Sequence, residues 1–539
     1  MANLWELPSA SCVRVCAKWK RLLEIEPETG KTDAVALEGP NMKFVLRSIG
    51  LLVLAGLALA IVLVAKTFSY GGGPAIEAVT LPDAPSSLSA ERAAQHLSEA
   101  IQFRTITYKA GDPEPGDEGP WLALHEWMRT TYPLAHDALQ LEKIADYTLL
   151  YTWPGQDPAL EPLLLMAHQD VVPINLGTID DWTGDPFAGE IIEGYIYGRG
   201  TIDDKGSMVA IMEAVEALVD DGFQPQRTVH LLFGHDEEVS GSGAEAGIAA
   251  LKARGVSPVM ALDEGSMVVD PNPLTGKRLG LIGVSEKGYL TLSLTVSAVG
   301  GHSSQPPRDS AAVRLSRAIV ALDENQMPAD LSKPPIADMF EVAAPDMAFG
   351  QRLAFANQWL FAGLIDSQMA AIPAGNAMIR TTTAPTMMTG SAKENVLPQR
   401  AMAMVNFRLH PNNTVEDVIT HVRNVTSDIE GLEVTVSGDS IGSEASPVSS
   451  TSNRAYAVLN SVARSVGDGA PVAPSIVIGA TDARYATAIT KSVYRFAPAL
   501  MGLEDLKGFH GTNERISVEN MGRMTAGYAQ IILAMDAAE

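Results

Sequence analysis

The amino-acid sequence predicts an α/β fold: a larger domain with a central mixed sheet flanked by helices, interrupted by an inserted ferredoxin-like α+β domain. Between residues 162 and 266, apolar runs such as PLLLMAH, RTVHLLFGH and PVMALDEG alternate with turns and helical segments. After Lys287 the order becomes strand, helix, two strands, helix and strand, which is typical of ferredoxin-like domains. The chain of 539 residues is long enough for both domains.

The N-terminal part contains one apolar run, Ile49 to Ala65, which is just long enough for a membrane-crossing helix. Lys43 and Arg47 precede it, so the positive-inside rule keeps the N-terminus in the cytoplasm. We expect a retained single-pass transmembrane signal anchor at 45–66, with the remainder on the periplasmic or extracytoplasmic side. Residues 1–41 are a doubtful extension, and our hypothesis is that translation starts at Met42.

Residues 67–89 are rich in Gly, Pro, Ser and Ala, and they predict a flexible tether. Beyond Lys66, 31 Lys and Arg oppose 58 Asp and Glu, a net charge of about −27 that argues against nucleic-acid partners. Cys12 and Cys16 both precede the apolar run, so a metal site in the remainder must use nitrogen and oxygen ligands.

The predicted domains follow from these patterns. The first part of the larger domain covers 90–286, and its second part covers 439–539, where α/β alternation returns. The inserted domain covers 287–438. Within it, about 326–390 is rich in Ala, Met and Pro and predicts a mostly helical insertion that shapes a lid or an interface.

Histidine and acidic residues follow the apolar strands of the larger domain. His168 ends LLLMAH, and Asp170 lies two residues on, on the same side of an extended backbone, where it can orient the histidine ring. Asp203 lies in the glycine-rich turn GRGTIDDKGS, where a short carboxylate can bridge two cations. Taken singly, a structural histidine and a helix N-cap explain these residues equally well.

Further along the chain, Glu237 and Glu238 follow RTVHLLFGHD, Asp263 ends an apolar strand, and His510 lies in GFHGTNER. Adjacent carboxylates repel each other unless a cation or a proton relieves them. A solvated acidic loop is the alternative for each site, but acidic residues at three strand exits make it a poor explanation. The set offers each of two ions one histidine, one terminal carboxylate and a shared Asp203, with a position left for water.

The motifs AHQDVVP, GRGTIDDKGS, HDEEVSG, LDEG and FHGTNE together resemble those of the metallopeptidase family that contains carboxypeptidase S, glutamate carboxypeptidase, aminoacylase and succinyl-diaminopimelate desuccinylase. The sequence looks most like the carboxypeptidase S branch, which includes the hydrolases and synthases of N-fatty-acyl amino acids. The resemblance covers essentially the whole chain after the tether. It implies that the larger domain is catalytic and that the inserted domain is a lid or dimerisation domain.

The resemblance also implies a role for each candidate residue. One ion would be held by His168, Asp203 and Asp263, and the other by Asp203, Glu238 and His510. Glu237 would be the general base that activates a metal-bridging water. His302, in SAVGGHSSQPP, would stabilise the oxyanion, whereas Asn395, Arg408 and Arg484 would bind the substrate carboxylate.

The expected function is metal-dependent hydrolysis of an amide bond next to a free C-terminal amino acid, in dipeptides or short peptides. An N-acyl-amino-acid amidohydrolase or synthase is the alternative among enzymes, and a catalytically silent surface binding protein is the alternative from another class. Two Zn²⁺ ions per subunit suit the donor set, although Co²⁺ or Mn²⁺ would also fit. Some family members dimerise through the inserted domain, so a homodimer is a further expectation.

Overall fold

A computed structural model describes residues 42–73, 76–437 and 442–537. The predicted extension, residues 1–41, lies outside this part of the chain. The chain divides into two compact units, residues 1–62 and 63–539. Helix α2 (Met42–Ser69) contains a stretch, Leu46–Ser69, that is long and apolar enough to cross a membrane, with a mean hydropathy of 2.8.

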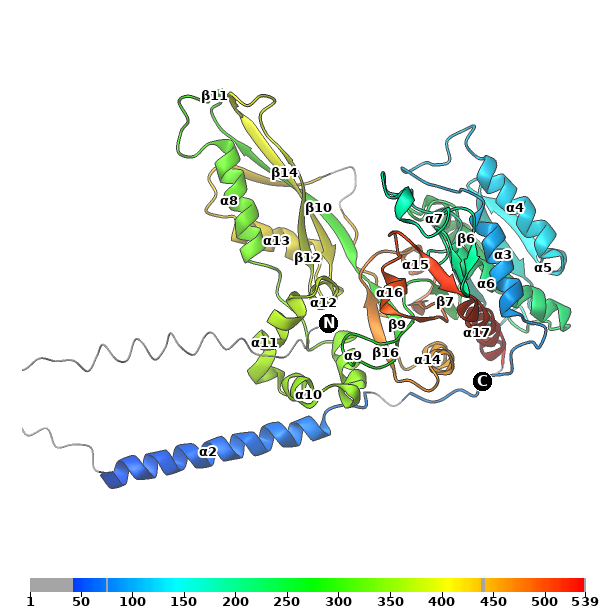
Figure 1. Ribbon diagram of the computed structural model, residues 1–539, viewed down its shortest axis with the longest axis horizontal. Coiled ribbons are helices and arrows are strands. Elements are labelled where there is room, and N and C mark those ends of the chain that lie inside the picture. The colour runs from blue at the N-terminus through cyan, green and yellow to red at the C-terminus, as the bar shows by residue number, and fades with distance from the viewer. Residues whose placement is uncertain (1–41, 74–75, 438–441, 538–539) are drawn as a thin grey trace, which may run out of the picture. The chain divides into compact units, whose positions relative to one another are not determined.

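The larger domain has a mixed central sheet flanked by helices, which confirms the predicted fold class (Figure 1). In spatial order the strands are β1 (Gln140–Ile144), β2 (Thr148–Trp153), β6 (Val229–Gly234), β3 (Leu163–His168), β7 (Met260–Asp263), β17 (Val493–Arg495), β9 (Leu279–Glu286), β8 (Val268–Val269) and β18 (Leu500–Met501), with β16 (Val472–Val477) paired to β9. The four adjacent strands β6, β3, β7 and β17 run parallel to one another. The pairs β1–β2, β2–β6 and β8–β9 are antiparallel.

Helices cover both faces of this sheet, because its central strands are apolar on both sides. In β3, Leu163 and Leu165 join one core cluster, whereas Leu164 and Met166 join another. The helices of this domain are α3 (Ala90–Ile101), α4 (Gly119–Thr131), α5 (Pro133–Ala138), η2 (Ile179–Asp181), α6 (Lys205–Asp220), α7 (Ser242–Ala253), α14 (Arg454–Val466), α15 (Ala483–Ala486), α16 (Leu503–Leu506) and α17 (Val518–Asp536). Helices α3, α6 and α17 pack on the sheet face that carries Leu163 and Leu165, and α7 packs on the face that carries Leu164 and Met166.

The turn that contains Asp203 follows a strand of a second, small antiparallel sheet. This sheet consists of β4 (Ile191–Ile192), β5 (Tyr195–Tyr197) and β19 (Arg515–Ser517). Because β19 pairs with β5, the segment before α17 lies against the segment before α6. This pairing joins two parts of the sequence that are over 300 residues apart.

The inserted domain is a four-stranded antiparallel sheet with two helices on one face (Figure 1). Its elements occur along the chain as β10 (Gly288–Ser297), α8 (Ala311–Glu324), β12 (Thr382–Thr389), β14 (Arg400–Leu409), α13 (Val415–Val425) and β15 (Leu432–Val436). The spatial order is β12, β14, β10 and β15. A short ribbon of β11 (Gly301–His302) and β13 (Val396–Leu397) lies beyond the end of β10.

The helical insertion is shorter than the sequence suggested. It contains α9 (Ile336–Ala343), η3 (Ala344–Asp346), α10 (Phe349–Ala356), α11 (Gln358–Ala370) and α12 (Pro373–Ile379). Residues 382–389, which belong to the predicted insertion, form strand β12 instead, because they pair with β14 on both sides of an irregularity between Pro385 and Met387. Ile336 and Phe340 of α9 pack against Ala473 and Ile476 of β16, so the insertion shares a core with the larger domain.

The expectation of a flexible tether at 67–89 is wrong for most of its length. Ile76, Val79 and Leu81 pack against the main core, and the Val79 amide donates to Ser461 Oγ at 3.0 Å. Gln530 Nε2 also donates to the Pro82 carbonyl at 3.2 Å. The Gly, Pro and Ser composition hid these apolar positions, which have partners only in the folded domain.

Candidate active site

The parallel strands β3, β6 and β7 end at one edge of the sheet, and each end carries polar residues. β3 ends at His168, β6 is followed by Glu237 and Glu238, and β7 ends at Asp263. The carboxyl ends of neighbouring parallel strands lie together, which is where ligands bind in such sheets. This topology explains why residues from distant parts of the sequence form one cluster.

Asp170 organises the start of the cluster. Its backbone carbonyl lies 3.0 Å from His168 Nδ1, and its Oδ1 lies 3.3 Å from the same nitrogen. Its Oδ1 and Oδ2 accept from the amides of Glu237 and Glu238 at 3.0 and 3.2 Å, and its Oδ2 accepts from Thr107 Oγ1. Asp170 therefore orients both the His168 ring and the backbone of the two glutamates.

Asp203 lies between the two histidines. Its Oδ1 is 2.8 Å from His168 Nε2, and its Oδ2 is 3.0 Å from His510 Nε2. His510 has a positive φ of 51°, an uncommon backbone conformation for a residue other than glycine. One short carboxylate thus presents one oxygen to each histidine, as a bridging ligand of two cations must.

Glu514, which was not among our candidates, holds the turn that carries Asp203. Its Oε1 accepts from the amides of Gly200, Ile202 and Asp203 at 2.8 to 3.2 Å, and its Oε2 pairs with Arg199 at 2.5 Å. Glu514 and Arg199 are both almost fully buried. No spacing along the chain predicts this contact, because it joins the FHGTNE and GRGTIDD motifs across the fold.

Glu238 faces the second histidine, since its Oε2 is 3.1 Å from His510 Nε2. Its Oε1 is buried and has no hydrogen-bond partner among the described residues. Glu237 lies close enough to the cluster to be affected by its charges. Burial, followed by the nearby charges of Asp482, Glu264 and Glu238, raises the pKa of Glu237 well above the usual value, against the effect of His168.

At the end of β7, the structure brings Glu264 rather than the predicted ligand Asp263 close to His168. Asp263 Oδ2 accepts from the Ala483 amide at 2.7 Å, whereas Glu264 Oε1 lies 3.4 Å from His168 Nε2. Among the described residues, two groups of three have ligand atoms within 4.8 Å of one another: His168 with Asp204 and Glu264, and His168 with Asp203 and Glu238. Because successive side chains diverge at a strand end, the residue after the strand, Glu264, faces the cluster.

The cluster concentrates negative charge away from water. Burial, together with the neighbouring carboxylates, raises the pKa of Glu238 and raises that of Glu264 to about 8. Both carboxylate oxygens of Asp204 are buried and without hydrogen-bond partners. Unpartnered carboxylate oxygens and two imidazoles facing one space form a donor set that suits two divalent cations with nitrogen and oxygen ligands.

The expected substrate-binding residues fall into three places. His302 is exposed, and its Nδ1 is 2.8 Å from Ser304 Oγ. The Ser303 amide donates to the Asn395 carbonyl, so His302 and Asn395 belong to the same β11–β13 ribbon. Arg408 stacks on Tyr289 at the opposite end of the inserted sheet. Arg484 donates to the Ser240 carbonyl at 2.7 Å, next to the Glu237 loop.

Comparison with known proteins identifies the family. A family model described as peptidase family M20/M25/M40 matches residues 164–534, which include every residue of the acidic cluster. The chain belongs to this metallopeptidase family. The predicted resemblance and the enzymatic class are thereby confirmed.

Curated relatives match most of the chain. A probable carboxypeptidase S-like protein of Dictyostelium discoideum is 37% identical over 84% of this chain and 86% of its own length. The N-fatty-acyl-amino acid synthase/hydrolase PM20D1 of Xenopus tropicalis is 36% identical, over 82% and 85%. Carboxypeptidase S of Saccharomyces cerevisiae is 29% identical, over 79% and 81%.

Solved structures show the same fold at low identity. An M20 family metallo-carboxypeptidase from Sulfolobus solfataricus has a TM-score of 0.58 at 19% identity, covering 82% of this chain and 99% of its own. Human carnosine dipeptidase 1 has a TM-score of 0.56 at 17% identity, covering 83% and 96%.

Proposed function

We propose that this chain is a membrane-anchored dimetal hydrolase that cleaves an amide bond next to a free C-terminal amino acid. The observation that carries the proposal is Asp203, whose two oxygens face His168 and His510 within a buried acidic cluster. Family membership and the carboxypeptidase S-like relatives support the reaction class.

His168, Asp203 and Glu264 would hold one cation, and Asp203, Glu238 and His510 the other. The short distances between His168 Nε2 and the oxygens of Asp203 and Glu264 favour Glu264 over Asp263 as a ligand. Zinc suits this donor set, as Co²⁺ and Mn²⁺ also would. When bound, the ions would polarise the scissile carbonyl and neutralise the developing charge.

Glu237 is the proposed general base. Burial raises the pKa of its carboxyl group, and a carboxylate with a raised pKa is a stronger acceptor for the proton of the attacking water. It then delivers this proton to the nitrogen of the leaving amine. Asp170 positions Glu237 through the hydrogen bond to its backbone amide.

Replacement of Glu237 by Gln tests this role. The amide cannot accept the proton, and we expect kcat to fall by about 10²–10⁴-fold or more while metal content stays unchanged. Glu245→Gln, on the exposed start of α7, is a matched control that should retain activity. Retained activity in the Glu237 variant would remove this residue from the general-base role, whereas folded parent protein that contains no metal ion would revive the surface binding protein as an explanation.

The substrate class has two candidates. Dipeptides or short peptides fit the carboxypeptidase S-like relatives, whereas the similarity to PM20D1 favours N-acyl amino acids as the alternative. Hydrolysis rates of glycyl dipeptides and of long-chain N-acyl amino acids, measured at equal concentration, should distinguish the two candidate substrate classes. Hydrolysis of only the N-acyl amino acids would replace the carboxypeptidase assignment.

The inserted domain is proposed to supply the remaining contacts. Asn395 and Arg408, with Arg484 from the larger domain, are the candidates for binding the substrate carboxylate, and His302 is the candidate for stabilising the oxyanion. His302 is exposed and belongs to the β11–β13 ribbon rather than to the acidic cluster. Its participation therefore requires that the ribbon approach the cluster from the same chain or from a second copy.

A second copy could pair along β12, which supports the expected homodimer. β12 is the edge strand of the inserted sheet, and most of its residues are exposed. Met387 and Met388 are 58% and 60% exposed. An exposed apolar edge strand is a ready surface for strand pairing between subunits.

Retention of α2 as a single-pass anchor is supported by the contacts of its last turns. Asn357 Nδ2 donates to the Leu63 carbonyl at 3.2 Å, and Arg352 Nε donates to the Tyr70 carbonyl at 2.9 Å. A cleaved signal peptide would have no reason to end in contacts with the folded enzyme. Lys43 and Arg47 before the apolar run support an extracytoplasmic position for the enzyme under the positive-inside rule. Intact-mass measurement of the natural protein tests whether residues 46–69 are kept.

A further inference from the structure

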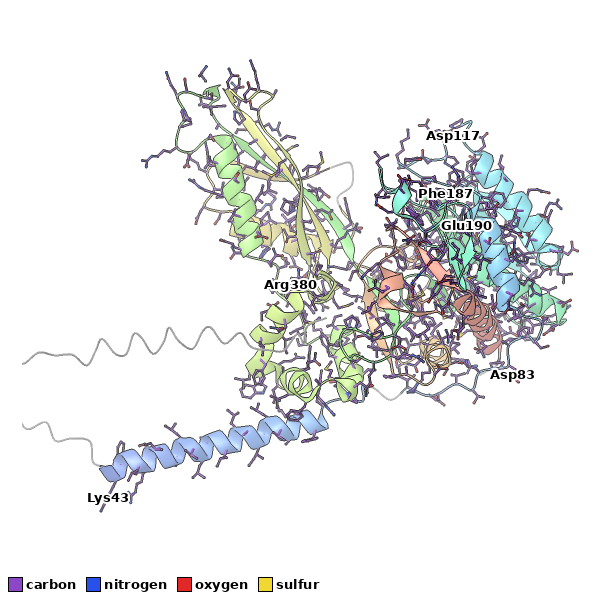
Figure 2. The ribbon with its side chains drawn as sticks, in the orientation of Figure 1. Lys43, Asp83, Asp117, Phe187, Glu190 and Arg380 are labelled. Carbon is purple, nitrogen blue, oxygen red and sulfur yellow. The ribbon has the colours of Figure 1, made fainter. Side chains whose placement is uncertain are left out.

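Helix α11 and its flanks are unusually apolar for a surface segment. From Leu353 to Ile379 the only charged residue is Asp366, which forms an ion pair with Arg380 (labelled in Figure 2). Apolar residues occur all round α11, yet Ile365 is its only buried residue. A helix that is apolar on every side is normally covered on every side, by protein or by lipid.

Large side chains make the uncovered surface strongly hydrophobic. Trp359 is 62% exposed, and Leu360 and Leu364 are 46% and 45% exposed. Phe349 of α10 and Ile372, just after α11, are also exposed. We call these five residues the α11 patch. Exposed apolar surfaces of this kind mark contacts with another protein or with a membrane.

The α11 patch adjoins the end of the membrane-spanning stretch. The rings of Phe349 and Phe68 lie 6.2 Å apart, and Phe68 belongs to the last turn of α2. Arg352 donates to the Tyr70 carbonyl, and Asn357 to the Leu63 carbonyl. The patch is therefore continuous with the segment that leaves the proposed bilayer, and this continuity identifies lipid as its partner.

The opposite side of the insertion is fixed to the enzyme. Phe340 stacks on Phe355 with ring centroids 4.3 Å apart, and Ile365 joins the same core as Ala473 and Ile476 of β16. Lys287 Nζ also donates to the carbonyls of Ala377 and Arg380. The patch is thus the outer surface of a packed element, and its exposure does not arise from a loose loop.

We propose that the α11 patch lies in the interfacial region of the bilayer that α2 crosses, with Trp359, Leu360 and Leu364 among the acyl chains. Trp is favoured at this depth, because its ring is apolar and its N–H reaches polar groups. Burying an apolar helix face there is the ordinary mode of interfacial attachment. This inference rests on the anchoring of α2 and extends it from a single helix to a second contact.

Fluorescent labelling of the full chain in phosphatidylcholine vesicles tests the proposal. In a chain with Cys12 and Cys16 replaced by serine, Leu364→Cys carries an environment-sensitive dye. Leu122→Cys, on α4 of the larger domain, is the control, because Leu122 is 44% exposed and Leu364 is 45% exposed. We expect blue-shifted emission at position 364 and loss of about half its fluorescence to spin-labelled lipid, with neither change at position 122.

The outcomes separate the two hypotheses. A chain that does not float with the vesicles overturns the anchor itself. A chain that floats while the dye at position 364 stays in a water-like environment overturns the α11 patch and leaves the anchor intact. In a third outcome, the dye at position 364 is shielded from water, is not quenched by spin-labelled lipid, and becomes more shielded as the protein-to-lipid ratio rises. This result would assign the α11 patch to contact with a second copy and would also overturn the proposal.

Discussion

The buried ion pair between Arg495 and Glu286 provides a stability prediction that the structure constrains closely. Arg495 is fully buried, Glu286 is 2% exposed, and Arg495 Nε lies 3.1 Å from Glu286 Oε2. The same oxygen accepts from the amide and the hydroxyl of Thr481 at 3.2 and 2.9 Å. Among the residues that the structure describes, Arg495 has only the Val493 carbonyl as another hydrogen-bond partner, at 3.3 Å, and its Nη2 has none.

Breaking a buried ion pair costs about 3–5 kcal/mol, because one charge stays buried without its partner. Arg495→Met leaves a carboxylate that keeps two neutral donors, so we place its cost near about 3 kcal/mol. Glu286→Gln leaves a buried guanidinium whose acceptors are all neutral oxygens, so its cost should lie at the upper end, about 5 kcal/mol. The double variant should recover much of the loss, because no unpaired charge remains.

Calorimetry of the three variants after metal removal measures these costs without a contribution from ion binding. A loss of about 3 kcal/mol corresponds to a Tm decrease of about 5 °C for a domain of about 300 residues, at about 2.1 cal/mol/K of unfolding entropy per residue. The reasoning is refuted if Arg495→Met lies within about 1 kcal/mol of the parent, or if the double variant is as unstable as the sum of the single ones.

Two further predictions concern metal binding and acid. The Glu264→Gln variant should lose about one of the two bound ions, whereas the Asp263→Asn variant should keep both, because Glu264 rather than Asp263 faces His168. Elemental analysis of both variants measures the metal content. The reverse pattern would restore Asp263 as the ligand. Burial lowers the pKa of His230 and of His410 from 6.5 to about 4, so the unfolded chain binds more protons between these pH values and stability falls as pH falls through this window. Each histidine should lower the free energy of unfolding by about 2 kcal/mol between pH 7 and pH 5, as measured by urea unfolding. Replacing either histidine by Gln should make the free energy of unfolding depend less on pH. An unchanged pH dependence would contradict a neutral buried histidine.

The mixed sheet and the position of the cluster could be predicted from the sequence, because β3, β6 and β7 are short apolar runs that end in polar residues. The choice between Asp263 and Glu264 could not, since it depends on the residue at which β7 stops and on the amide of Ala483 that engages Asp263. Glu514 was missed for a related reason: its partners are backbone amides more than 300 residues away. Such contacts leave no local pattern in the chain.

The packing of residues 76–88 was also beyond sequence reasoning. Ile76, Val79 and Leu81 are separated by residues typical of linkers, and no helical or alternating period connects them. Their apolar side chains pack against the main core, and the backbone beside them bonds to Ser461 of α14 and Gln530 of α17, much later in the chain. Composition predicts a linker here, and tertiary packing overrides it.

The cluster's residues span the chain from His168 to His510, and no short segment contributes more than an adjacent pair of donors. Small zinc domains fold around their ion, because one short segment supplies most of the ligands. Here the register of β3, β6 and β7 and the pairing of β19 with β5 must exist before the donors meet. Ion capture would therefore follow folding, and for an exported chain the metal supply of the receiving compartment would decide which ion the enzyme carries.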